Sequence, residues 1–183
     1  AIVGARAEDP DGEFNAGAAY IFTKSSGDWT QTQQLTASDR EAYDEFGYSV
    51  AISGSTAIVG SPFEGEDFYD SSGHYLSGAA YIFTESSGDW SQTQKLTAGD
   101  RGWADSFGYS VAISGDTAIV GAYKEDPDGV NNAGAAYIFT KVGNTWSQTQ
   151  KLTAGDPERF DYFGYSVAIS GTTAIVGAWA EDI

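Results

Sequence analysis

Oxygen-bearing side chains are grouped in a loop sequence that occurs twice. Residues 8–15 read Glu-Asp-Pro-Asp-Gly-Glu-Phe-Asn, and residues 125–132 read Glu-Asp-Pro-Asp-Gly-Val-Asn-Asn. Alternate positions in the first copy carry oxygen ligands, as a calcium loop can. The candidate calcium ligands are Asp9, Asp11, Glu13, Asn15, Asp126, Asp128 and Asn132. The alternative is that Asp-Pro-Asp-Gly is only a favourable turn sequence.

Catalytic groups are few. The chain has no Cys and a single His, His74, in a longer acidic loop at 64–77 that also holds Glu64, Glu66, Asp67 and Asp70. The sequence has no phosphate loop, nucleotide fingerprint or zinc spacing. Carboxylates are numerous enough for a glycosidase-like pair, so a hydrolase ranks last among the functional hypotheses.

A second acidic pattern, Asp-x-x-x-x-Asp-x-Phe-Gly, occurs three times with variable residues between the aspartates. Its aspartates are Asp39, Asp44, Asp100, Asp105, Asp156 and Asp161. Because the aspartates are constant and the residues between them vary, we expect the aspartate side chains to accept backbone hydrogen bonds at a junction between structural units. Metal binding is the alternative.

Aromatic side chains are frequent in the same connecting segments. Those predicted to face a ligand are Tyr43, Trp103, Tyr123, Phe160 and Trp179. Aromatic residues are enriched in recognition surfaces. Packing between structural units is the alternative for most of them.

Charge and hydropathy exclude several kinds of partner. Twenty-six acidic against 9 basic residues give a net charge of -17, which repels nucleic acid phosphates and anionic membranes. No apolar run approaches the ~20 residues of a membrane helix, so no membrane insertion is expected. Cations, proteins and glycans remain as ligands, and Ca²⁺ is the one cofactor predicted.

Internal repetition dominates the chain. Ala-Ile-Val-Gly begins at residues 1, 57, 118 and 174, and Phe-Gly-Tyr-Ser-Val-Ala-Ile-Ser begins at 46, 107 and 163. Gly-Ala-Ala-Tyr-Ile-Phe-Thr begins at 17, 78 and 134, and a tryptophan opens a polar segment at 29, 90 and 146. Residues 1–183 are therefore predicted to form one repeat domain of about three units.

Each repeated segment has the pattern of a β-strand. Residues 46–53 alternate bulky and small side chains, and residues 56–60 form a short apolar run typical of a strand buried on both faces. Residues 17–23 are rich in β-formers, and residues 29–35 are polar enough for an outer edge strand. The chain is predicted to be all-β, with four-stranded antiparallel blades arranged as a β-propeller or an open row.

These segments resemble the FG-GAP repeats of integrin alpha subunits and of secreted bacterial and archaeal proteins. The matching stretches are Phe46-Gly47 through Gly60-Ser61-Pro62, Phe107-Gly108 through Gly121-Ala122, and Phe163-Gly164 through Gly177-Ala178. The resemblance implies an extracellular propeller. Integrin-type repeats place a calcium loop between the first two strands, but here that connection is too short to wrap an ion.

The resemblance and composition together favour a non-enzymatic module at the cell surface or outside the cell. Its expected role is adhesion, ligand binding or structural scaffolding, including fibre or multimer formation. A carbohydrate-binding propeller is the alternative. Because the chain starts in the middle of a repeat, it is expected to be a piece of a longer protein or to associate with itself through its terminal blades.

Overall fold

The computed structural model describes residues 1–65 and 76–180. The predicted loop residues Glu66, Asp67, Asp70 and His74 lie outside these ranges. The described part consists of strands and two single 3₁₀ turns. In chain order they are β1 (Ile2–Ala5), η1 (Pro10–Gly12), β2 (Ala18–Ser25), β3 (Asp28–Leu35), β4 (Ser49–Ser53), β5 (Thr56–Ser61), β6 (Ala79–Ser86), β7 (Asp89–Leu96), β8 (Ser110–Ser114), β9 (Thr117–Ala122), η2 (Pro127–Gly129), β10 (Ala135–Val142), β11 (Thr145–Leu152), β12 (Phe163–Ser170) and β13 (Thr173–Ala178).

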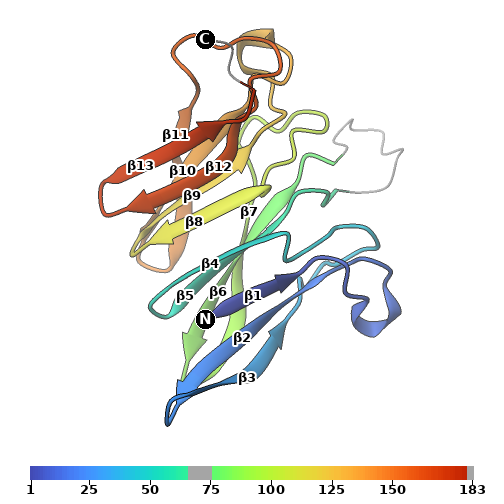
Figure 1. Cartoon of the computed structure of the whole chain (residues 1–183), viewed down its shortest axis with the longest axis vertical. Helices are drawn as coiled ribbons and strands as arrows, with labels where there is room; N and C mark the ends of the chain where they lie inside the picture. The colour runs from blue at the N-terminus through green and yellow to red at the C-terminus, as the bar shows by residue number, and fades with distance from the viewer. Residues whose placement is uncertain (66–75, 181–183) are drawn as a thin grey trace.

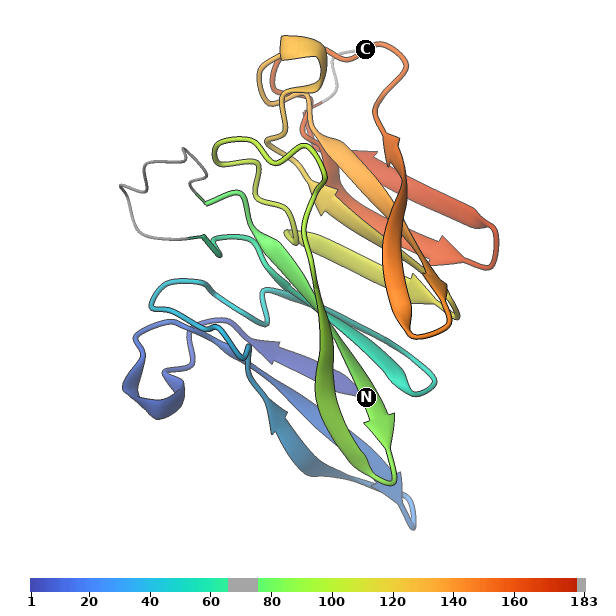
Figure 2. The ribbon, with the colours of Figure 1, turned by 180° about the vertical axis from the view of Figure 1, so that it is seen from behind.

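The strands form four antiparallel sheets that follow one another along the long axis of the molecule (Figures 1 and 2). The first sheet is β1-β2-β3, the second β4-β5-β6-β7, the third β8-β9-β10-β11 and the fourth β12-β13. Short hairpins lie along one edge of this stack, and the longer loops lie along the other (Figure 1). The all-β prediction and the four-stranded meander are confirmed.

The second strand of each complete sheet lies at the centre of the core. In β5, Ala57, Ile58 and Val59 have no exposed surface. Both faces of this strand are covered. Ile58 packs in a cluster with residues of the third sheet, and Ala57 and Val59 pack in a cluster with residues of the first sheet. The predicted burial on both sides explains why this segment has no polar alternation.

The phenylalanines of the first two Phe-Gly pairs pack between sheets, Phe46 in a cluster with Ile21 of the first sheet and Phe107 in a cluster with Ile58 of the second. Phe46 is fully buried, and its ring lies 5.5 Å from that of Tyr81 and 5.9 Å from that of Phe83. The predicted strand at 46–53 is shorter than expected, since β4 begins only at Ser49. Gly47 has a φ of 89°, which breaks the extended conformation. Phe46 instead donates its N–H to the carbonyl of Ala16 in the preceding sheet's loop, at 3.0 Å.

Two glycines meet wherever consecutive sheets adjoin, and we call this the glycine contact. A Cβ on Gly60 of β5 would collide with the carbonyl oxygen of Gly108, and one on Gly121 of β9 with that of Gly164. The serine that opens the adjoining strand completes the contact. Ser49 donates its hydroxyl to the Gly108 carbonyl at 2.8 Å, and Ser110 does the same to Gly164. The interface therefore requires bare backbone at these glycines.

The outer strands are joined by glutamines. The side chain of Gln33 donates to the Trp90 carbonyl at 2.7 Å and accepts the Trp90 N–H at 2.8 Å. Gln94 holds Trp146 with the same two bonds and distances. We call this pair of bonds the glutamine clasp. The polarity of the outer strands thus has a role that sequence analysis did not assign.

No helix in the described ranges is both long and apolar enough to cross a membrane.

We expect Gly60→Ala to lower the free energy of unfolding by about 3 kcal/mol, because its Cβ forces the second and third sheets apart. Gly155→Ala is the matched control, since a Cβ there meets no atom within 4 Å. Urea denaturation of both variants measures the difference. Equal stability of the two variants would show that the glycine contact is not tight.

Candidate functional site

A row of tyrosines runs across the sheets, and we call it the tyrosine ladder. Its members are Tyr48, Tyr109 and Tyr165, which follow the Phe-Gly pair in successive repeats. The ring centroids of Tyr48 and Tyr109 are 4.8 Å apart, and those of Tyr109 and Tyr165 are 5.0 Å apart. The ladder therefore connects the second, third and fourth sheets.

Each of these three sheets adds a second ring from the loop that follows its second strand. Phe63 lies 6.2 Å from Tyr48, and Tyr123 lies 4.3 Å from Tyr109. Trp179 stacks on Tyr165 at 5.9 Å with 24° between the ring planes. The tyrosine ladder and these three rings form one aromatic surface.

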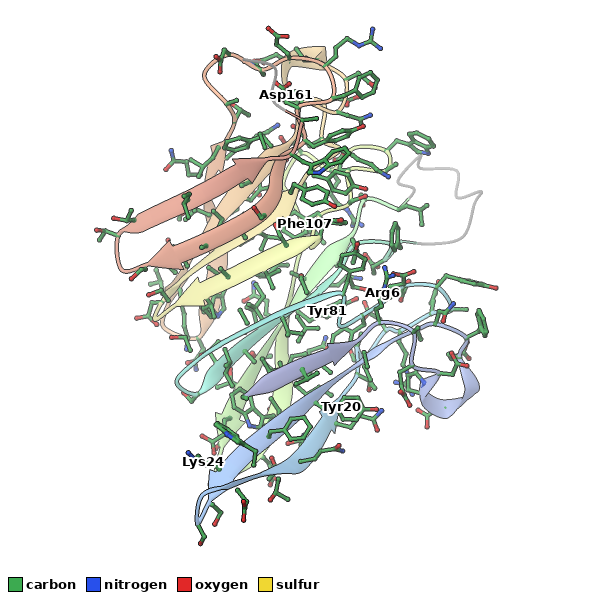
Figure 3. The ribbon with its side chains drawn as sticks, in the orientation of Figure 1. Arg6, Tyr20, Lys24, Tyr81, Phe107 and Asp161 are labelled. Carbon is green, nitrogen blue, oxygen red and sulfur yellow. The ribbon has the colours of Figure 1, made fainter. Side chains whose placement is uncertain are left out.

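Exposure of this surface increases toward the fourth sheet. Tyr48, Tyr109 and Tyr123 are half-buried, whereas 36% of Tyr165 and 69% of Trp179 are exposed. Arg6 lies at the loop edge of the stack, and Lys24 lies at the opposite, hairpin edge (Figure 3). The guanidinium group of Arg6 lies over the Tyr48 ring, 4.9 Å from its centroid. Lys124 lies 5.2 Å from the Tyr123 ring centroid. The ring faces thus attract cations, as expected for π systems.

The hydroxyl groups of the ladder interact with one another. Burial raises the pKa of Tyr109, and hydrogen bonds to the hydroxyls of Tyr165 and Tyr48 raise it further. Tyr109 therefore keeps its proton at neutral pH.

The structure brings together some of the aromatic residues predicted to face a ligand. Tyr123 and Trp179 belong to the aromatic surface, and Phe160 reaches it through Tyr162 at 6.2 Å. Tyr43 instead packs on Phe14 at 5.3 Å. Trp103 is 73% exposed and contacts no other aromatic ring in the part of the chain that the structure describes.

The sequence patterns did not predict the tyrosine ladder itself. Tyr48, Tyr109 and Tyr165 were interpreted as part of the bulky face of a core strand. Their signal was present, because a tyrosine at one fixed position of every repeat must form a row wherever repeats stack in register.

The first aspartate of the repeated acidic pattern bridges two sheets. Asp39 accepts a bond from the ammonium group of Lys95 in β7 at 2.6 Å, and Glu64 accepts a second at 2.6 Å. Asp100 and Glu125 hold Lys151 in β11 in the same way, each at 2.7 Å. The third such aspartate, Asp156, is exposed.

The second aspartate of the pattern closes a local turn. Asp44, Asp105 and Asp161 are each at most 4% exposed. They accept the backbone N–H three residues earlier, at 2.7, 2.5 and 2.6 Å respectively. These contacts are of the kind that the pattern predicted for a blade junction.

The electrostatics of the junction follow from burial and from the lysine. Burial raises the pKa of Asp44 to about 7, and it also raises the pKa values of Asp105 and Glu125. Partial burial works against ionisation of Asp39 too, but the hydrogen bond and charge of Lys95 outweigh it and lower its pKa.

A raised carboxyl pKa is also what a hydrolase needs. Here the same arrangement occurs at two successive junctions, and each is occupied by a lysine ammonium group. Asp44 is 97% covered and bonded to backbone, which leaves no approach for a substrate. We therefore interpret these carboxylates as structural.

The predicted calcium loops are closed by their own backbone. Asp9 accepts the Asn15 N–H at 2.6 Å, and Asp126 accepts the Asn132 N–H at 2.6 Å. Asp11 forms an ion pair with Arg40. Glu13 and Asp128 are exposed. Within residues 1–65 and 76–180, no three acidic or histidine side chains gather closely enough to hold a metal ion.

Comparison with known proteins gives one result for the repeats. A sequence model described as the FG-GAP repeat matches residues 29–83, 90–139 and 146–183, which is more than half of the chain. No curated protein matches the sequence.

The raised pKa of Asp44 predicts that stability falls as the pH rises from about 3.8 to about 7. The folded chain keeps this proton up to about pH 7, whereas the unfolded chain loses it near 3.8. Folding therefore takes up a proton between these values, and the free energy of unfolding falls as the pH rises through that window. We expect Asp44→Asn to flatten this dependence and to raise the melting temperature at neutral pH. Asp116→Asn, at an exposed hairpin, controls for the loss of one negative charge.

Calcium binding by the loops stays a prediction. It requires that CaCl₂ raise the melting temperature, that EDTA reverse the rise, and that the double variant Asp9→Asn and Asp126→Asn abolish it. An unchanged melting temperature in saturating CaCl₂ would contradict it.

Proposed function

The chain belongs to the FG-GAP repeat family, and we propose on that basis that it is a non-enzymatic ligand-binding module of the cell surface or extracellular space. FG-GAP repeats typically occur in extracellular proteins, and the family is generally non-catalytic. The observation that carries the proposal is the aromatic surface built from the tyrosine ladder with Phe63, Tyr123 and Trp179.

The position of this surface supports binding. Its rings come from the starts of the first strands and from the loops that follow the second strands. These loops lie along the loop edge of the stack (Figure 1). Strand sequences repeat almost unchanged, but the position that holds Tyr123 and Trp179 holds Pro62 in the second sheet, where the next residue, Phe63, supplies the ring. Variation on a constant scaffold is typical of a recognition surface.

The exposed end of the surface supports an energetic role as well. Large aromatic rings supply most of the binding free energy at many interfaces. Trp179 and Tyr165 together present a broad apolar area to solvent, with 69% and 36% of each residue exposed. A protein ligand that covers these rings would remove this area from water.

A glycan is the alternative ligand. Trp179 stacks on Tyr165 and is 69% exposed, so its indole offers a flat aromatic surface to solvent. A flat aromatic face suits the apolar face of a sugar ring. The same surface would then serve adhesion through carbohydrate instead of protein.

We expect Trp179→Ala to weaken ligand binding by at least about tenfold in Kd. The labelled chain is applied to an array that carries extracellular matrix proteins and glycans, and each positive spot is titrated. Trp103→Ala is the matched control, because Trp103 is equally exposed but lies outside the aromatic surface.

Two outcomes would contradict the proposal. One is an array without any positive protein or glycan. The other is equal loss of binding in the Trp103→Ala and Trp179→Ala chains, which would place the site elsewhere. Positive spots confined to glycans would select the carbohydrate alternative.

A further inference from the structure

The tyrosine ladder has a second chemical capacity, which does not depend on any ligand. We propose that it is a site of oxidative cross-linking, where Tyr109 becomes joined to Tyr48 or Tyr165 as dityrosine. The bond links adjoining sheets, because Tyr48 precedes β4, Tyr109 precedes β8 and Tyr165 lies in β12.

Geometry places the reacting atoms near one another. The centroid of the Tyr109 ring lies 4.8 Å from that of Tyr48 and 5.0 Å from that of Tyr165, with interplanar angles of 40° and 48°. Both neighbouring phenol groups contribute to the raised pKa of Tyr109. Coupling joins the ring carbons ortho to the hydroxyl groups, and centroid separations of 4.8 and 5.0 Å keep these carbons of neighbouring rings near one another.

The composition directs oxidation to these rings. The chain has no Cys and no Met, which are the side chains that oxidants usually attack first. It has 11 Tyr and 5 Trp residues. Tyrosine and tryptophan side chains are therefore the groups that a one-electron oxidant oxidises in this chain.

The exposed end of the aromatic surface gives an oxidant access. Trp179 is 69% exposed and stacks on Tyr165, which in turn contacts Tyr109. An electron removed at Trp179 or Tyr165 can be replaced from Tyr109 through rings in contact. The radical then resides beside a second oxidisable phenol.

The step balances with hydrogen peroxide as the oxidant and a haem peroxidase as its catalyst. Each phenol loses one electron and one proton to give a phenoxyl radical. The two ortho carbons form a bond, and each ring regains aromaticity as its ortho hydrogen moves to oxygen. The two phenols lose two hydrogen atoms in total, and one hydrogen peroxide is reduced to two waters.

The test uses the whole chain at low concentration with peroxidase and hydrogen peroxide. Mass spectrometry should show a monomer that has lost two hydrogen atoms, together with dityrosine fluorescence. Trypsin cleaves after Lys and Arg, so Tyr109 lies in peptide 102–124, Tyr48 in 41–95 and Tyr165 in 160–183. We expect peptide 102–124 joined to 41–95 or to 160–183, with fragmentation placing the bond at Tyr109.

Matched variants separate the ladder from general oxidation. Tyr109→Phe keeps the ring and removes the phenol, and the joined peptides should disappear. Tyr43→Phe removes an exposed phenol that packs on Phe14 outside the ladder, and the yield should stay unchanged. Circular dichroism of each variant checks that the fold is retained.

A wild-type yield from Tyr109→Phe would overturn the proposal, as would cross-links found only between chains. Equal yields of the joined peptides from the native and the urea-unfolded chain would overturn it too, because the native ladder would then contribute nothing.

Discussion

Consecutive sheets approach so closely that bare backbone must meet bare backbone. At Gly60 and Gly108, and again at Gly121 and Gly164, there is no space for a Cβ. This one steric requirement fixes the separation and the register of the sheets. The other contacts between sheets, namely the buried phenylalanine, the serine hydroxyl and the glutamine clasp, all depend on that register. The side chains at the glycine contact are no larger than those of alanine and serine. The close approach of the backbones therefore gives this part of the interface the packing density of a protein core.

The same register determines where chemistry-bearing side chains lie. Because each sheet repeats the one before, Tyr48, Tyr109 and Tyr165 must form a row, and Lys95 and Lys151 must reach the aspartates of the preceding loop. An ion pair half-covered by protein is stronger than one in free solvent, but burial also costs solvation. Here two carboxylates share each ammonium group, and the Tyr81 or Tyr137 ring lies below it. The junction thus combines charge with aromatic contact.

Repetition made most of the fold predictable from sequence. The strands, their antiparallel order and the burial of residues such as Ile58 could be predicted from the repeated pattern of apolar and polar residues, because these features depend on residues close together in the sequence. The start of β4 was predicted three residues too early, because the alternation at Phe46 and Tyr48 concealed the left-handed Gly47. Contacts between sheets could not be predicted, since partners such as Asp39 and Lys95 are 56 residues apart. Only the relative placement of two blades brings them together. For the same reason, the pairing of Asp11 with Arg40 had no local signal.

The glutamine clasp makes the interface directional. Every complete sheet offers a glutamine on one side and a tryptophan backbone on the other, so Gln94 extends to the next sheet while Trp90 is held by the previous one. A repeat duplicated in tandem within the gene would carry both the glutamine and the tryptophan that the interface requires. Lengthening the protein by whole repeats would therefore need no new contact to be invented, and unequal recombination could adjust its size in a single step.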